Sequence, residues 1–299
     1  MVRKLFYLFI GILLLAACGL HKNQRGDDSG VDTSLVEGPL PDDGKLINDV
    51  IQSFSSPVEM AALLKDLKVP YNSKILCRTD NVDDYNTNFK KALGIGVFSV
   101  DLGYLNIYNK SSSIMGQITI IKRLADGIQV GQFFDFTTLK RLATSNENLD
   151  SLMFLSVNSF NQMDNYLRES NRGNLSALII TGMWIEGLYL ATEVYKEKTT
   201  PELSERIGEQ KIILDDMMVI LKNYKNDKNF ALLIQELEEI KAVFDEVKIT
   251  YEAGNPETVE KDGMLIIVQN EKSNVKITPE QIKNITAKIE KIRNKIIEL

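Results

Sequence analysis

Two segments of this 299-residue chain are apolar on every side, and they constrain the fold more than any other feature. One runs from Ala92 to Tyr108 and the other from Ala177 to Tyr195. A surface helix has one apolar stripe, whereas a helix without a polar face must be enclosed by neighbouring helices. We therefore expect an all-α fold, a multi-helix bundle with these two segments at its centre.

Both central segments contain glycines, each of which costs up to about 1 kcal/mol of helix stability relative to alanine. The positions are Gly94, Gly96 and Gly103 in the first segment, and Gly182 and Gly187 in the second. Close approach of two backbones explains glycine inside a helix. The sequence therefore predicts tight packing between the two central helices.

Each central segment carries one acid with a tyrosine three residues later, on the same helical face. The pairs are Asp101 with Tyr104 and Glu186 with Tyr189. A buried carboxylate is unfavourable unless it is hydrogen-bonded, paired or protonated. We expect a buried polar network in which Tyr104, Tyr189, Tyr85 or an arginine such as Arg172 satisfies the two acids. The alternatives are a ligand- or cation-binding cleft and a catalytic carboxylate pair of the glycosidase type.

The two central segments also match each other at an offset of 85 residues, which aligns Asp101 with Glu186 and Tyr104 with Tyr189. An internal duplication, in which each half contributes one central helix, is one interpretation of this match. Chance similarity between two apolar helices is the other.

The remaining apolar spacing is helical nearly throughout. We expect helices over about residues 56–68, 81–109, 112–130, 136–143, 148–170 and 175–198. Thr200-Pro201 opens a further helix, and another follows Asn226-Asp227, continues past Tyr251 and ends at Gly254. Alternating steps of three and four along these last two predict an antiparallel pair across a short turn.

The C-terminal part combines a β-rich stretch with a final helix. Residues 264–268 and 275–277 predict a short β-hairpin with its turn at 269–274. Thr278-Pro279-Glu280-Gln281 then opens a helix with a reciprocal cap. A stripe of isoleucines follows it, which we expect to dock on the bundle, with a partner helix or dimer contact as the alternative: Ile282, Ile285, Ile289, Ile292 and Ile296.

The N-terminus has the pattern of a bacterial lipoprotein signal. Arg3-Lys4 precedes an apolar run, Leu5–Leu15, which ends in Ala16-Ala17-Cys18. The run is too short to span a bilayer, which takes about 20 residues. We expect residues 1–17 to be a signal peptide, 18–43 a flexible tether from an acylated Cys18, and 44–299 one helical domain. An ordinary signal peptide with a coincidental cysteine, or a membrane-spanning helix, is the alternative.

The residues after Cys18 indicate the membrane to which a lipoprotein of this kind would be sorted. Gly19 follows the cysteine rather than aspartate, which in the enterobacterial sorting rule implies transport to the outer membrane. The acidic pair Asp27-Asp28 comes late for a surface-export signal. We therefore favour an anchor facing the periplasm over one on the cell surface.

Charge, cysteine and histidine exclude several function classes. Removal of residues 1–17 takes away Arg3 and Lys4, so the 35 basic residues become 33 and the net charge changes from −6 to −8. An acidic chain is not typical of nucleic-acid binding. The single histidine, His21, lies in the tether, so histidine-dependent nucleophilic catalysis and histidine zinc sites are not expected in the body. We expect no cofactor and no metal.

After acylation of Cys18 one thiol remains, Cys77, so no intramolecular disulfide can form. Its apolar neighbours Ile75 and Leu76 predict a small buried hydrophobic residue, with a reactive thiol as the alternative. The polar turn before the second central helix holds Arg168 and Arg172. These arginines could hold an anion, although a solvated helix cap is the simpler interpretation.

Four stretches of the sequence are similar to a group of all-helical lipoproteins of Bacteroidetes-type bacteria that has no established activity. The resemblance extends over about residues 50–199, and it implies a helical fold, an envelope location and two acidic positions shared by the group. The stretches are Ser56–Glu59, Val100–Tyr104, Tyr166–Arg172 and Gly182–Tyr189.

The sequence thus predicts a non-enzymatic envelope lipoprotein, attached to membrane lipid through Cys18, whose helical body binds a protein partner or a small ligand. The first alternative is a hydrolase that uses Asp101 and Glu186 as paired carboxylates. The second is an assembly role through the isoleucine helix.

Overall fold

The computed structural model describes residues 67–80, 82–144, 149–261 and 264–297. All of them belong to one compact unit, Pro41–Leu299. The predicted lipid site at Cys18, the tether 18–43 and most of the helix predicted over 56–68 lie outside the described residues.

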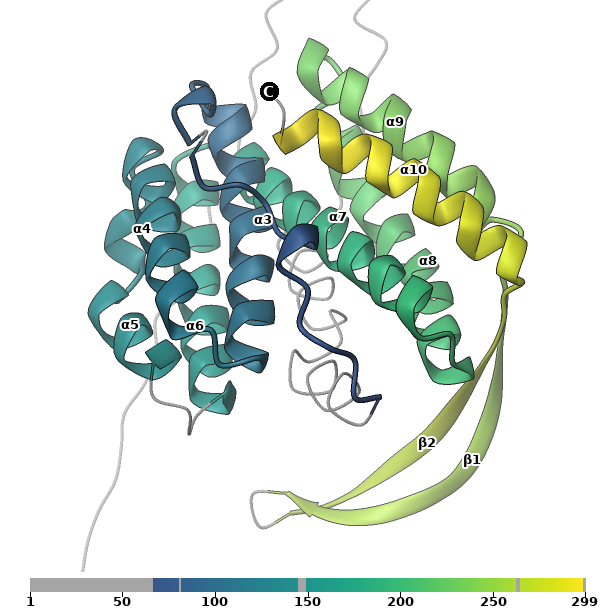
Figure 1. Cartoon of the computed structure of the whole chain (residues 1–299). Helices are drawn as coiled ribbons and strands as arrows, with labels where there is room; N and C mark the ends of the chain where they lie inside the picture. Colours follow the sequence, from purple (N-terminus) through teal and green to yellow (C-terminus); the bar gives the residue numbers. More distant parts are fainter. Residues whose placement is uncertain (1–66, 81, 145–148, 262–263, 298–299) are drawn as a thin grey trace, which may run out of the picture. The chain divides into compact units, whose positions relative to one another are not determined.

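The described residues form a helical bundle with one β-hairpin before the last helix, which confirms the predicted fold class (Figure 1). The two short 3-10 helices that come first, η1 and η2, span Ser73–Ile75 and Val82–Asp84; a third, η3, spans Gly131–Phe133. The α-helices are α3 (Asn88–Ile107), α4 (Ser111–Gly127), α5 (Phe136–Thr144), α6 (Leu149–Glu169), α7 (Gly173–Glu197), α8 (Pro201–Lys222), α9 (Lys228–Phe244) and α10 (Pro279–Ile297). The strands are β1 (Lys248–Lys261) and β2 (Met264–Lys276).

Helices α3 and α7 are the predicted central pair, and their backbones touch. A Cβ atom on Gly96 would collide with the carbonyl oxygen of Ile179, and one on Gly182 with that of Leu93. The start of α3 at Asn88 lies by the start of α7 at Asn174, and further along both helices Asp101 lies beside Glu186, so α3 and α7 run parallel. Tight packing is confirmed at Gly96 and Gly182.

The prediction is wrong for two other glycines. A Cβ on Gly103 or Gly187 would meet nothing within 4 Å. Both residues lie on partly exposed faces of their helices, where no second backbone approaches. An apolar segment therefore does not imply backbone contact at each of its glycines.

Helix α7 is the one described helix that is long and apolar enough to cross a membrane. Within its most apolar window, 89% is buried inside the bundle. Enclosure by the other helices therefore accounts for its composition, as expected of a central helix.

The first central helix begins later than predicted. The sequence favours a helix from residue 81, whereas α3 begins at Asn88 after the short helix η2. Thr87 is its N-cap and accepts a hydrogen bond from the Lys90 N–H at 3.2 Å. The capping threonine sets the first residue of the helix, whereas the prediction relied on apolar spacing alone and therefore placed the start too early. The helices predicted from residue 112 to 198 are present within a few residues of their expected bounds.

Helices α8 and α9 form the predicted antiparallel pair. Ion pairs join Lys241 to Asp215 at 2.6 Å and Lys222 to Glu238 at 3.3 Å, so the later position in α8 pairs with the earlier position in α9, as in an antiparallel pair. The predicted end of α9 is wrong, because the helix stops at Phe244.

The β-hairpin is longer than predicted and begins earlier. Lys248 pairs with Lys276 and Lys261 with Met264, so the predicted turn at 269–274 lies inside β2. Tyr251, expected on a helix, lies on β1 and is 58% exposed. Its spacing from earlier apolar residues fits a helix, but Ile249, Thr250 and Tyr251 are residue types that favour strands.

The C-terminal helix docks on the bundle as predicted. The Thr278 N–H donates to Gln281 Oε1 at 2.8 Å and the Gln281 N–H donates to Thr278 Oγ1 at 3.2 Å, which is the reciprocal cap expected from the sequence. Every member of the isoleucine stripe is buried, with at most 4% exposed. Helix α10 packs against α7 and α9.

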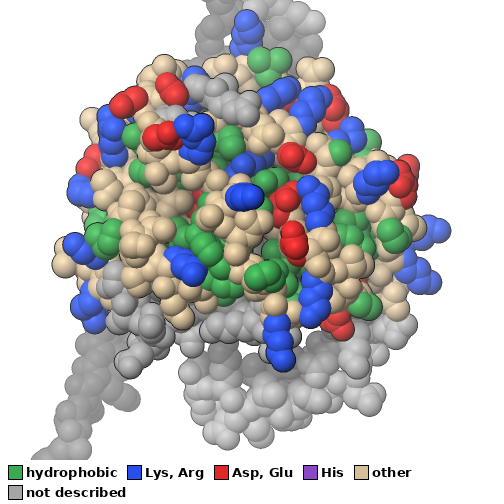
Figure 2. All heavy atoms as spheres, in the orientation of Figure 1, with side chains coloured by type: hydrophobic (Ala, Val, Ile, Leu, Met, Phe, Trp, Pro, Cys, Tyr) green, Lys and Arg blue, Asp and Glu red, His purple; other side chains and the backbone are tan. Residues whose placement is uncertain are grey.

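Charges of both signs are interspersed over the face of the molecule drawn in Figure 2. Among the described residues, ion pairs also join neighbouring helices, for example Lys295 with Glu236 and Lys291 with Glu239. This face therefore carries no extended basic patch of the kind that phosphate backbones require.

We predict opposite effects for two alanine substitutions within α7. Gly182→Ala places a methyl group against the Leu93 carbonyl and should lower the free energy of unfolding by about 1–3 kcal/mol. Gly187→Ala is the matched control; it meets open space and should stabilise the helix by up to about 1 kcal/mol. Urea unfolding measures both. Equal losses in the two variants would contradict the close approach of α3 and α7.

Candidate functional site

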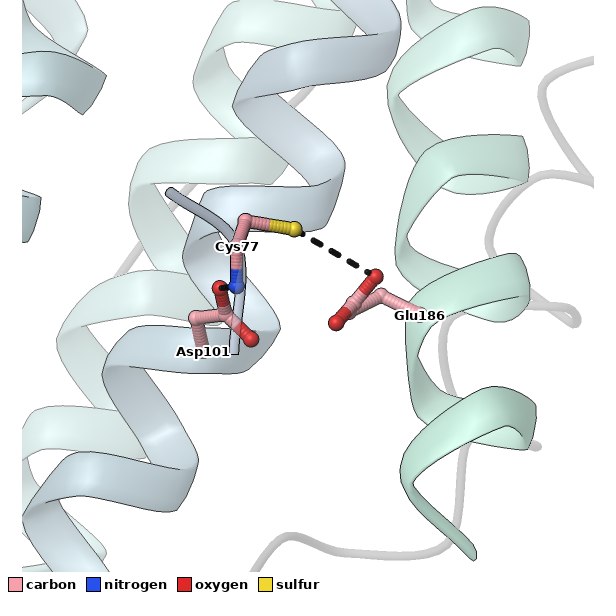
Figure 3. A group of neighbouring side chains, drawn as sticks. All are labelled: Cys77, Asp101 and Glu186. Atoms are coloured by element: carbon pink, nitrogen blue, oxygen red, sulfur yellow. Dashed lines mark hydrogen bonds between the residues drawn. The ribbon is translucent and has the colours of Figure 1, made fainter. Parts of the chain in front are cut away.

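Four segments bring charged and polar side chains together in the core. Asp101 comes from α3, Glu186 from α7, Arg293 from α10, and Cys77 from residues 67–80, which we call the strap. The two acids are fully buried, while Cys77 is 7% and Arg293 4% exposed. Figure 3 shows Asp101 and Glu186 facing each other, with Cys77 beside them. We call these four residues the polar cluster.

The strap has no regular structure except η1, and side chains of the helices hold its backbone. The Cys77 N–H donates to Asp101 Oδ2 at 2.9 Å, and the Asn72 N–H donates to Tyr104 Oη at 3.1 Å. The Tyr108 hydroxyl donates to the Val69 carbonyl at 3.0 Å. These bonds satisfy backbone groups that neither a helix nor a sheet pairs.

Arg293 neutralises Glu186. Its Nε donates to Oε2 at 2.9 Å and its Nη2 to Oε1 at 3.0 Å, which is the bidentate arrangement that favours arginine. The guanidinium carbon lies 4.2 Å from the centre of the Tyr189 ring, so the cation also contacts an aromatic face. Burial raises the pKa of Glu186, and the bonds to Arg293 act against that rise. Glu186 is the ionised member of the carboxyl pair.

Asp101 is the protonated member. Burial, and then the nearby Glu186 carboxylate, raise the pKa of Asp101 well above its ordinary value. Its Oδ2 accepts from the Cys77 N–H and, at 3.2 Å, from Gln117 Nε2. Its Oδ1 has no hydrogen-bond partner among the described residues, and a proton on this oxygen would let it donate to the neighbouring Glu186 carboxylate. One proton and one guanidinium thus balance two carboxyl groups.

Cys77 is buried as predicted, but it belongs to the polar cluster rather than to the apolar core. Its Sγ accepts from Arg293 Nη2 at 3.0 Å and donates to Glu186 Oε2 at 3.8 Å. Burial, Glu186 and Asp101 raise the pKa of the thiol. A neutral, enclosed thiol does not fit the alternative of a reactive cysteine.

The cluster has a donor set that a metal ion could use. Ligand atoms of Cys77, Asp101 and Glu186 lie within 4.8 Å of one another. The Arg293 guanidinium already contacts the sulfur and both oxygens of Glu186. A metal ion would have to displace it, so Arg293 is the cation that these side chains accommodate.

Three of the predicted site residues make no hydrogen bond to the acids: Tyr104, Tyr189 and Arg172. Tyr189 instead covers the guanidinium of Arg293. Tyr104 lies near the strap and accepts from Asn72. Arg172 is elsewhere, since its Nη2 donates to the Ile128 carbonyl at 2.6 Å. The prediction that Arg172 satisfies the acids is therefore wrong. Arg168 pairs with the buried Asp164 at 2.8 Å.

The sequence analysis missed Arg293 and Gln117. Arg293 lies four residues after Ile289 and three before Ile296, which places it on the buried face of α10. Gln117 lies three residues after the buried Ile114 on α4 and is 2% exposed. The sequence does hold a signal for both residues, because each has the same helical spacing as the apolar residues on the buried face of its helix.

Two surface cavities lie away from the acids. One of about 340 Å³ is lined by the end of α7 and the start of α10, including Tyr195 and Ile282. The other, of about 330 Å³, lies where α3, α7 and α9 begin and includes Arg172 and Asn174. Neither Asp101 nor Glu186 lines either cavity.

No protein-family model, curated protein or solved structure matches this chain. The internal duplication therefore stays a prediction, although the structure places the two aligned acids side by side. The proposed function rests on the chemistry of the polar cluster and on the sequence.

We predict unequal effects for amide substitutions of the two acids. Asp101→Asn retains an acceptor for Cys77 and Gln117 and a donor for Glu186, so the free energy of unfolding should change by less than about 1 kcal/mol. Glu186→Gln leaves the buried guanidinium without a counter-charge and should cost about 3–5 kcal/mol. Urea unfolding distinguishes the two variants. Equal losses would show that the proton does not reside on Asp101.

The raised pKa of Asp101 predicts a pH dependence of stability. A pKa that is higher in the folded than in the unfolded chain gives stabilisation that is complete below the unfolded pKa and is lost as the pH rises through the folded pKa. The wild-type free energy of unfolding should therefore fall in that range, and Asp101→Asn should flatten the fall. Parallel pH profiles of the two proteins would contradict this assignment.

Proposed function

We propose that this chain is a lipid-anchored envelope protein whose helical body binds a partner protein or a small ligand and does not catalyse a reaction. The observation that carries the location is the apolar run that ends in Leu15-Ala16-Ala17-Cys18. Acyl chains on a mature N-terminal cysteine would hold the protein stably, because two chains suffice for anchoring. We place the body on the periplasmic side of the outer membrane, with the cell surface as the alternative.

The geometry of the carboxyl pair favours binding over hydrolysis. A glycosidase needs two carboxyl groups that face a substrate and, at some stage, a water molecule. Asp101 and Glu186 are fully buried and lie side by side, and Arg293 pairs with Glu186. A hydrolase would also need room for a substrate beside these acids, and neither acid lines either of the two surface cavities.

An assembly role through the isoleucine helix has less support. Its apolar stripe is buried within the bundle, which leaves no apolar face of α10 for a second helix. The acidic net charge of −6 and the mixed charges in Figure 2 support a partner other than a nucleic acid.

The anchor is tested by Cys18→Ser in the native envelope. We expect the unaltered protein to stay with membranes after a high-salt wash and its N-terminal peptide to carry lipid by mass spectrometry. Cys18→Ser should release it into the soluble fraction, because a serine hydroxyl is not acylated at such a signal. Cys77→Ser is the matched control and should remain membrane-bound. Retention of Cys18→Ser, or an unlipidated native peptide, would refute the proposal.

A further inference from the structure

Two further polar side chains, Gln117 and Tyr85, lie next to the polar cluster without being needed for the packing of α10. Gln117 Oε1 and the Tyr85 hydroxyl are buried and have no hydrogen-bond partner among the described residues. Tyr85 interacts electrostatically with Cys77, Glu186 and Asp101, and burial raises its pKa. Buried ion pairs can often be replaced by apolar residues without loss of stability. Unpaired buried groups beside two acids therefore suggest a role other than stability.

Arg293 is held as a ligand would be. Glu186 binds the guanidinium with both oxygens, the Tyr189 ring covers one face, and the Ile75 carbonyl accepts from Nη2 at 2.9 Å. A carboxylate fork, an aromatic face and a carbonyl are the groups that recognise a planar, delocalised cation. A primary amine would not match this planar arrangement.

The strap and α10 together cover this arrangement. Arg293 joins them, because the same Nη2 that binds Glu186 also binds Ile75 of the strap. The strap is held by side chains rather than by a sheet or a helix. Removal of both segments would leave the backbone contact between α3 and α7 intact, since Gly96 and Gly182 lie on those two helices.

We propose that α3 and α7 carry a binding site for a guanidinium group, such as an arginine side chain of a partner protein, and that Arg293 occupies this site in the free protein. The strap and α10 are then a lid that opens as one unit. Exchange of one guanidinium for another leaves the charge of the site unchanged and keeps the proton on Asp101. This inference deepens the proposed binding role and rests on it, but it does not depend on acylation of Cys18.

The test uses the thiol of Cys77 as a reporter of lid opening. In the full chain with Cys18→Ser, Cys77 is the only thiol, and it should react slowly with a thiol reagent because it is buried. Millimolar methylguanidinium should accelerate labelling severalfold by replacing Arg293, whereas urea at the same concentration should not. Equal rates with and without methylguanidinium would overturn the proposal.

In the same Cys18→Ser background, Arg293→Ala should reverse the effect of methylguanidinium on the labelling rate of Cys77. The empty site should label faster, and methylguanidinium should now slow labelling and raise the melting temperature, because a ligand that binds the folded state stabilises it. Arg293→Ala combined with Glu186→Gln is the matched control and should show neither effect. A response in the control equal to that in Arg293→Ala would overturn the site.

Hydrogen exchange keeps the proposal testable if Arg293→Ala does not fold. In the Cys18→Ser chain, the amides of Cys77 and of α10 should exchange with one shared opening free energy, lower than that of α3 and α7. Exchange of these amides only through global unfolding would overturn the lid. Membrane fractionation tests the lipid anchor at Cys18 separately, so failure of the anchor and failure of the guanidinium site can be told apart.

Discussion

The ion pair between Arg293 and Glu186 is the interaction on which the rest of the core depends. It joins the last helix to a central helix, and through the Ile75 carbonyl and the Cys77 sulfur it also fixes the strap. One guanidinium therefore connects the strap, the first described segment, and α10, the last one, to the central helix α7. Loss of either charge would leave the other buried and uncompensated, which is among the most destabilising changes a core can undergo.

Asp101 and Glu186 look equivalent in sequence, yet the structure gives them different protonation states. Only Glu186 receives the guanidinium, so the second carboxyl in the same enclosed space must hold a proton. Asp101 then acts as a neutral donor and as an acceptor for the strap. The difference comes from which acid α10 reaches, and not from the helix on which each acid lies.

The sequence predicted those parts of the fold that depend on neighbouring residues. The all-round apolar segments identified α3 and α7, and the isoleucine stripe identified the docking of α10, because each pattern repeats within one helix. The polar cluster was only half predictable. Arg293 meets Glu186 across 107 residues and Cys77 across 216, and no local pattern links such positions. The start of the hairpin was misplaced because the spacing of three and four up to Tyr251 fits a helix, although Ile249, Thr250 and Tyr251 are residue types that favour strands.

The parallel course of α3 and α7 affects how the protein is made. Two parallel neighbours cannot form a helical hairpin, so the chain that forms α4, α5 and α6 must emerge from the ribosome before Gly96 can meet Gly182. Contacts between such distant residues form slowly. Until α7 is made, the face of α3 that will pack against it stays exposed, and exposed apolar surface of this kind favours aggregation.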